Sequence, residues 1–139
     1  MKRNFLSIVF AIILLFCCFA CNGGEGKCSL VTCEENRVVI LVEETDGKAT
    51  LLNCMESLAE ENAAFTYTME GGMITEINGK KNAVDFSSCW MLYTSDAEMS
   101  NTEWGTVEYE GESIGSAILG AESLVVTEGE VYIWVYQTF

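Results

Sequence analysis

Residues able to perform acid–base or nucleophilic chemistry are unevenly represented in this sequence. It contains 21 acidic residues and no histidine, so acid–base catalysis would depend on carboxylates or a lysine. Several carboxylates fit solvated faces and strand edges, namely Glu60, Glu61, Glu108, Glu110 and Glu112. No serine or cysteine stands in a recognisable nucleophile setting, and no EF-hand, phosphate-binding or dinucleotide-binding pattern is present. The sequence therefore predicts a protein that is not an enzyme and holds no cofactor.

The first 20 residues predict a signal peptide. Lys2 and Arg3 precede an apolar run over residues 5–16, followed by a small residue at a possible cleavage point. This run is shorter than an ordinary membrane-spanning helix. We therefore expect residues 1–20 to direct export and not to belong to the folded domain.

The residues around the expected cleavage point resemble the lipobox of bacterial lipoproteins, in which the new amino-terminal cysteine receives lipid. Here that cysteine is Cys21, preceded by Ala20, whereas Cys18 and Phe19 depart from the family pattern. Lipid on Cys21 would anchor the chain at the outer face of a cell membrane, with residues 21–36 as a flexible tether. Simple secretion and an uncleaved anchor are the alternatives.

The remaining cysteines suit an oxidising compartment. Four of the seven follow Cys21, which allows two disulfides. Cys28 and Cys33 predict a local bridge, whereas Cys54 and Cys89 stand in apolar patterns that fit either small buried thiols or a second bridge. Their spacing does not fit a four-cysteine zinc site, so we predict no metal centre.

The charge of the chain excludes one class of partner. The formal net charge is −14, and two of the seven basic residues belong to the expected signal peptide. Such a surface repels phosphates, so we expect no nucleic-acid binding. Solubility at the cell exterior is the simplest reason for the charge, and an acidic binding patch is the alternative.

The pattern after the tether predicts one domain over residues 37–139, of the α+β class. A strand over residues 37–43 is apolar on both faces, and Thr50 precedes a helix whose apolar residues recur at spacings of three and four up to Asn62. Short strands follow, separated by the turn pairs Gly71-Gly72, Asn78-Gly79, Glu110-Gly111 and Glu128-Gly129. We expect a mixed sheet with the helix packed on one face.

Aromatic side chains are the candidate binding residues. In the last strand, over residues 131–136, β-branched and aromatic residues alternate, so the two sets lie on opposite faces. We expect Val131, Ile133 and Val135 to meet the helix, which leaves Tyr132, Trp134 and Tyr136 on the other face. That face is either a ligand platform or the cover of a thin core. Trp104 stands in the polar segment 94–105, which we expect to be a loop, as a ligand contact or a loop anchor.

The order of several segments resembles the DUF4430 domain, the transcobalamin-like C-terminal domain. The resemblance covers residues 37–139 and rests on four segments: 50–55 (TLLNCM), 72–79 (GMITEING), 89–93 (CWMLY) and 126–136. It implies a β-grasp-like fold of the soluble-ligand-binding type, and a corrinoid such as cobalamin as a ligand. The chain lacks the helical partner domain of the cobalamin carriers and has no histidine for cobalt.

Together these features predict a non-catalytic, lipid-anchored, extracytoplasmic binding module for a soluble ligand, with cobalamin or another corrinoid as the specific candidate. The alternative is a cell-surface interaction or scaffold module that recognises a protein or a glycan, since the same aromatic residues would serve both functions. The predicted contacts are Trp90, Tyr93, Trp104, Tyr109, Trp134 and Tyr136.

Overall fold

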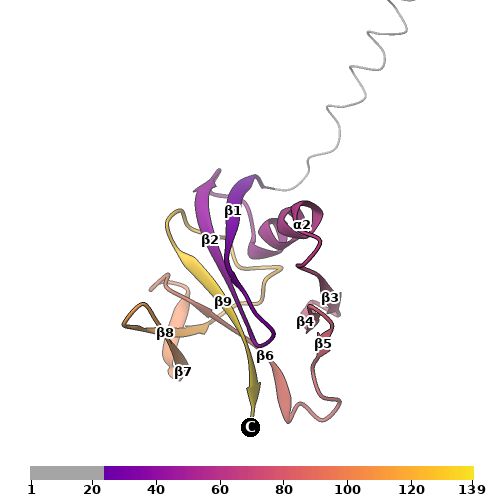
Figure 1. Cartoon of the computed structure of the whole chain (residues 1–139). Helices are drawn as coiled ribbons and strands as arrows, with labels where there is room; N and C mark the ends of the chain where they lie inside the picture. The colour runs from indigo at the N-terminus through magenta and orange to yellow at the C-terminus, as the bar shows by residue number, and fades with distance from the viewer. Residues whose placement is uncertain (1–23) are drawn as a thin grey trace, which may run out of the picture.

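The computed structural model describes residues 24–139, which form two antiparallel sheets and one helix (Figure 1). The larger sheet has the strand order β1-β2-β9-β6-β8-β7. The bounds of β1, β2, β6, β7, β8 and β9 are Gly26–Cys33, Arg37–Thr45, Ser88–Thr94, Ser100–Tyr109, Glu112–Ala117 and Val131–Thr138. The smaller sheet contains β3 (Tyr67–Glu70), β4 (Met73–Ile77) and β5 (Lys80–Lys81), and helix α2 spans Leu51–Glu61.

The prediction of an α+β domain with a β-grasp-like mixed sheet is wrong. Every strand pairing among residues 24–139 is antiparallel, and α2 is the only helix in that range, so the described chain is mainly β. Tight turns join several pairs of consecutive strands, which allows only antiparallel pairing. The connection that contains the helix leads from β2 in the large sheet to β3 in the small one, so it does not link parallel strands.

Helix α2 forms where the sequence predicts it. The hydroxyl of Thr50 accepts a hydrogen bond from the backbone N–H of Asn53, and the side chain of Asn53 accepts one from the backbone N–H of Thr50. This reciprocal pair satisfies two backbone donors that the first turn leaves free. Asn62 ends the helix as its C-cap, also as predicted. The apolar side of the helix is buried through Leu51, Cys54, Met55 and Leu58.

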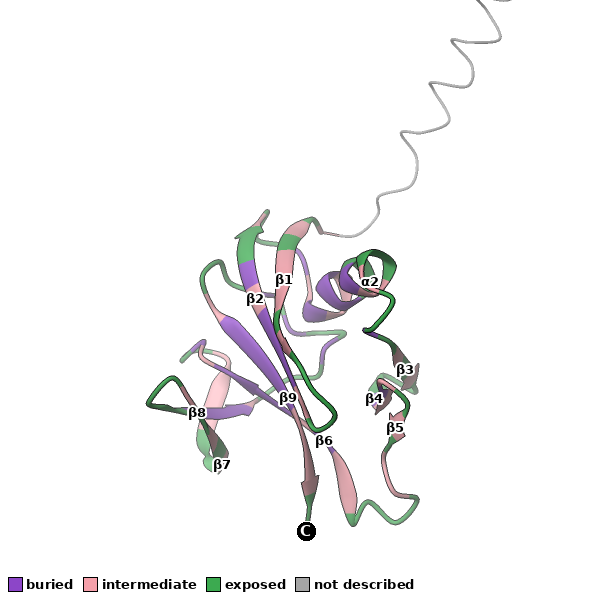
Figure 2. Cartoon of the chain, in the orientation of Figure 1, coloured by how far each residue is buried: buried purple, intermediate pink, exposed green. Residues whose placement is uncertain are grey.

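The main core lies between one face of the large sheet, helix α2 and the small sheet. Figure 2 shows that the buried part of α2 faces the large sheet. Met55 and Leu58 of the helix pack in the same cluster as Ile40 of β2, Ile77 of β4 and Phe65. The small sheet therefore shares with the helix the covering role that the sequence assigned to the helix alone.

The last strand, β9, presents its aromatic side chains to this core, opposite to the prediction. Tyr132 lies opposite Ile40 and Trp134 lies opposite Val38, and both aromatic residues belong to the cluster that contains the helix. The β-branched residues face the second core cluster and do not meet the helix; they are Val131, Ile133 and Val135. Alternation along a strand separates two faces but does not say which one is covered by the helix.

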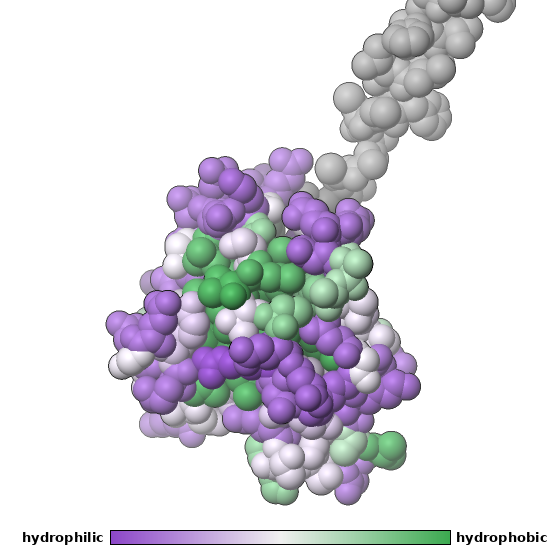
Figure 3. Space-filling model, viewed as in Figure 1, coloured by the Kyte–Doolittle hydropathy of each residue, from purple (hydrophilic) through white to green (hydrophobic). Residues whose placement is uncertain are grey.

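The second face of the large sheet is covered in part by the β7–β8 hairpin. Ile114 of β8 is buried with Ile133 and Tyr93, and Val107 and Tyr109 of β7 pack beside them. Beyond this cover, an apolar area surrounded by hydrophilic residues lies over β1, β2 and β9 (Figure 3). The aliphatic side of β9 is therefore buried by its own packing partners, without any contribution from the helix.

Three hairpins close through two-residue turns in which both central residues have positive φ, at 71–72, 78–79 and 110–111. This geometry suits the right-handed twist of antiparallel pairs. Two of these turns contain residues that readily adopt it, whereas the third places Glu110 at a φ of 50° before Gly111. The turn pairs predicted from the sequence at these positions are confirmed.

The prediction of a flexible tether over residues 21–36 is wrong for most of the described part of that segment. Residues Gly26–Cys33 form β1, which pairs with β2 along the edge of the large sheet. The predicted signal peptide over residues 1–20 and the lipidation site at Cys21 lie outside the described residues. Within residues 24–139, no helix is both long enough and apolar enough to cross a membrane.

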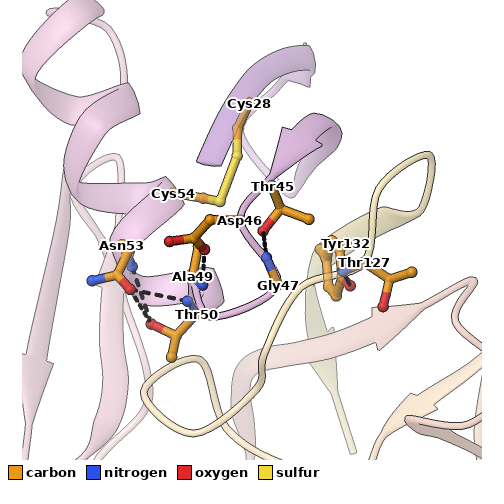
Figure 4. Close-up of a disulfide and its surroundings, with 10 residues drawn as sticks. All are labelled: Cys28, Thr45, Asp46, Gly47, Ala49, Thr50, Asn53, Cys54, Thr127 and Tyr132. Atoms are coloured by element: carbon orange, nitrogen blue, oxygen red, sulfur yellow. Dashed lines mark hydrogen bonds between the residues drawn. A yellow bond between two sulfur atoms is a disulfide. The ribbon is translucent and has the colours of Figure 1, made fainter. Parts of the chain in front are cut away.

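The cysteine pairing also differs from the prediction. Cys28 of β1 is bonded to Cys54 of α2, with Cα atoms 5.9 Å apart, and not to Cys33 (Figure 4). Five residues along an extended strand span about 16 Å, which is too far for a bridge between Cys28 and Cys33, because bridged Cα atoms lie within roughly 7 Å. In the described chain Cys33 is an exposed thiol and Cys89 a half-buried one, whose pKa is raised by burial.

Candidate functional site

The six predicted aromatic contacts do not form one platform. Trp90, Trp134 and Tyr136 belong to the core on the helix side of the large sheet, whereas Tyr93 and Tyr109 belong to the cluster on the opposite face. Trp90, Trp134 and Tyr93 are buried. A single aromatic surface on the uncovered face of the sheet therefore does not exist.

Several of these aromatic side chains hold strands together. The Trp90 indole donates through Nε1 to the backbone oxygen of Lys80 at 2.8 Å, and the Tyr136 hydroxyl donates to that of Lys81 at the same distance. The two rings meet edge to face with centroids 5.4 Å apart. Tyr93 donates to the side-chain oxygen of Gln137 at 2.7 Å. Trp90 and Tyr136 thus fasten β5 to the large sheet, which is a structural role.

All three tryptophans nevertheless line one cleft. Its volume is about 340 Å³, and it opens beside the place where β6 and β8 separate after pairing at only two positions, Tyr93 with Ser116 and Thr94 with Gly115. Residues 72–74 and 117–121 form other parts of its lining. The cleft therefore lies where the large sheet, the small sheet and the segment after β8 meet.

Two buried polar atoms belong to residues that line this cleft. The indole Nε1 of Trp134 and the hydroxyl Oγ of Ser116 have no hydrogen-bond partner among residues 24–139. Trp134 is 5% exposed and Ser116 is 3% exposed. An unmade hydrogen bond of a buried group costs about 1–3 kcal/mol, and such groups are uncommon in folded proteins. Both atoms are inaccessible to solvent, so a ligand in the cleft would reach them only if neighbouring side chains moved.

Trp104 stands at the cleft on an irregular part of β7. The β7–β8 register breaks between Asn101, opposite Ser116, and Thr106, opposite Gly115, so residues 102–105 bulge out of the pairing. Gly105 has a φ of 129°, a conformation open to glycine but rarely to other residues. The side chain of Trp104 is 63% exposed while still lining the cleft. The sequence-based expectation of a loop over residues 94–105 is thus wrong from Ser100 onward.

A larger groove of about 840 Å³ lies between the start of β1, the end of β2 and α2. Its lining is rich in carboxylates. The one that accepts the most hydrogen bonds, Asp46, is already bonded to backbone groups of the protein. Asp46 accepts hydrogen bonds from the backbone N–H groups of Glu25, Lys48 and Ala49, and Figure 4 shows the one from Ala49. These bonds, first of all that from Glu25, lower the pKa of Asp46 below its ordinary value of 3.8. The carboxylate therefore closes a turn, and the groove gives no sign of an unmet interaction.

Sequence reasoning selected the three tryptophans of the cleft and missed its other walls. Ser116 lines the cleft together with Met73, Ile118 and Leu119. Met73, Ile118 and Leu119 are exposed apolar residues. A signal was present at 118–119, where two large aliphatic residues follow a strand and precede Gly120. Their meeting with Met73 depends on how the two sheets pack, which no local pattern shows.

No known protein family, curated protein or solved structure matches this chain. The resemblance to DUF4430 therefore stays a prediction. Its expected β-grasp-like mixed sheet is replaced by the antiparallel topology described above.

Proposed function

We propose that the chain is a non-catalytic, extracytoplasmic binding module that holds a soluble ligand in the cleft between β6 and β8. The observation that carries this proposal is the exposed ring of Trp104, which lines a concave, largely apolar cleft. Ligand sites are typically apolar clefts with a few polar groups that fix the orientation of the ligand. This cleft has that composition.

The lining supports binding without catalysis. Among the described residues that line it there is no carboxylate, lysine, histidine or cysteine, so Ser116 has no base beside it to activate its hydroxyl. The lining instead offers large contact surfaces through Trp104, Met73 and Leu119. Trp104 combines an exposed ring with a fixed position on the bulge of β7, which favours stacking on a ligand.

The volume of the cleft restricts how a large ligand can bind. About 340 Å³ is near the lower end of the range for small-molecule sites, which is roughly 300–1,000 Å³. A corrinoid would place only one edge or side chain inside and would lie across Trp104 at the mouth. The exposure of Trp104 also favours the second candidate, in which a surface protein or glycan inserts one side chain or one sugar ring.

Replacing Trp104 with alanine tests the site. We expect Trp104→Ala to weaken ligand binding about thirtyfold or more, because an aromatic residue central to a contact commonly contributes at least about 2 kcal/mol. Isothermal titration calorimetry with cobalamin, with cobinamide and with candidate glycans or surface proteins measures the loss.

Phe139→Ala is the matched control, because Phe139 is an exposed aromatic residue outside the cleft. It should bind like the unsubstituted chain. Equal affinity of Trp104→Ala for a ligand that the unsubstituted chain binds would show that the site lies elsewhere.

We also propose that the chain is held at a membrane by lipid on Cys21, which lies outside the described residues. Support comes from the resemblance of residues 18–21 to a lipobox. Cys21→Ser should abolish incorporation of labelled fatty acid and release the protein from the membrane fraction. The exposed Cys33→Ser variant is the control. Labelling that survives Cys21→Ser would refute the lipid anchor.

A further inference from the structure

We infer that the ligand of the β6–β8 cleft is a small amphipathic cation, whose apolar body lies in the cleft while its ammonium group lies at the mouth over the ring of Trp104. This inference rests on the proposed function and specifies its ligand class. Amines that bear one aromatic or aliphatic group belong to this class. The argument depends on the polarity of the cleft and on the charges around its mouth.

The cleft has an uncharged interior and an open mouth. None of the described lining residues carries a charge, so an ion inside the cleft would lose its hydration without gaining a counter-charge. Met73 and Trp104 are lining residues that are largely exposed, so a charged group beside them keeps its contact with water. A ligand with one apolar end and one charged end therefore suits the cleft better than a ligand that is charged throughout.

The charge next to the mouth is negative. A carboxylate oxygen of Glu122 lies 3.0 Å from the position that a Cβ on Gly72 would occupy, and Gly72 lines the cleft. Glu103 precedes Trp104 in the bulge of β7, and Glu70 is the last residue of β3, two positions before Gly72. All three glutamates are exposed, and none forms an ion pair with another residue that the structure describes. This arrangement attracts a cation to the mouth and repels an anion.

The two lysines of β5 do not offset this charge, because each is paired with a carboxylate and neither lines the cleft. Lys80 pairs with Glu35 at 3.6 Å, and Lys81 pairs with Glu76 at 3.9 Å. The Lys80 ammonium nitrogen also lies 4.5 Å from the centre of the Tyr136 ring. An ammonium group over an aromatic ring is thus a contact that this fold already makes, and the exposed tryptophan ring of the cleft offers a second place for it.

Three probes of similar shape test the inference: phenethylamine, phenylethanol and phenylacetate. Binding is followed through the indole N–H resonances of the three tryptophans in ¹H–¹⁵N spectra, with that of Trp104 assigned by Trp104→Phe. We expect phenethylamine to bind saturably, about threefold more tightly than phenylethanol, which is the effect of one exposed cation–π contact. It should bind about tenfold more tightly than phenylacetate, which the glutamates repel. Added salt should reduce the second difference, because salt screens charges at an exposed mouth.

Glu122→Gln tests the charge at the mouth. It removes one exposed carboxylate and should weaken phenethylamine binding about twofold to threefold, while phenylethanol binding stays unchanged. The double variant Glu103→Gln/Glu122→Gln should weaken phenethylamine binding further. Glu128→Gln is the matched control, because Glu128 is also exposed and lies in the turn before β9, away from the lining residues.

Three results would overturn the inference. They are no saturable binding of phenethylamine, binding of phenylethanol or phenylacetate that is as tight as that of phenethylamine, and a phenethylamine affinity that the double variant leaves unchanged. A lysine beside an aromatic side chain on a polypeptide offers the same chemistry, so acetyl-Phe-Lys-amide is a fourth probe. Binding of this peptide more tightly than phenethylamine would overturn the assignment to a small ligand, and weaker binding supports it. The proposed function fails separately, if Trp104→Ala leaves the affinity for every bound ligand unchanged.

Discussion

Replacing Tyr132 with alanine is expected to lower the free energy of unfolding by about 3–5 kcal/mol, the range for removing a large buried aromatic side chain. Tyr132 is fully buried in the cluster that joins the large sheet, α2 and the small sheet. The substitution leaves a cavity between three elements that cannot easily close together. Urea unfolding followed by circular dichroism measures the change.

Two further variants separate the causes of the Tyr132→Ala effect. Tyr132→Phe keeps the ring but removes the hydroxyl oxygen that accepts a hydrogen bond from the backbone N–H of Thr127 at 2.8 Å (Figure 4), and should cost about 1 kcal/mol. Trp104→Ala, at a mostly exposed position, should change stability by less than about 1 kcal/mol. If Tyr132→Ala were as mild as Trp104→Ala, the aromatic face of β9 would not be the core face.

Removing the Cys28–Cys54 disulfide with the double variant Cys28→Ala/Cys54→Ala is expected to cost about 3–4 kcal/mol. The bridge closes a loop of 26 residues, and constraint of the unfolded chain by such a loop is worth roughly 3.5 kcal/mol. Adding a reductant to the unsubstituted chain should produce a similar loss. Urea unfolding with and without reductant measures both effects.

Cys33→Ala and Cys89→Ala serve as controls, because these thiols have no disulfide partner among the described residues. The exposed Cys33 position should change stability by no more than about 0.5 kcal/mol. Insensitivity of the unfolding midpoint to reductant would contradict a stabilising bridge between β1 and α2.

Local signals predicted the helix and the hairpin turns of this fold. Thr50 and Asn62 cap the two ends of α2 as expected. The turn pairs at 71–72, 78–79 and 110–111 all close hairpins. Each of these features depends on residues within a few positions of one another, so the sequence contains the whole signal.

Pairings and contacts between distant parts of the chain could not be predicted in the same way. Strand β2 pairs with β9, which is more than 80 residues further along the chain, and this pairing decides which face of β9 meets the helix. Strand β1 follows glycine-rich residues that favour a tether, and its place in the sheet depends on β2 and on the bond from Cys28 to Cys54. The three tryptophans of the cleft could be selected from their residue type. Ser116 could not, because it lines the cleft only as a result of the separation of β6 and β8.

The inclusion of β1 in the large sheet has a consequence for the proposed lipid-anchored state. With the first strand beginning at Gly26, five peptide units separate it from Cys21, a reach of at most about 18 Å. If the tether extended to residue 36, the maximum distance between the domain and the bilayer would be several times larger. In the proposed lipid-anchored state, the short connection would instead hold the first strand of the domain within about 18 Å of the lipidated residue.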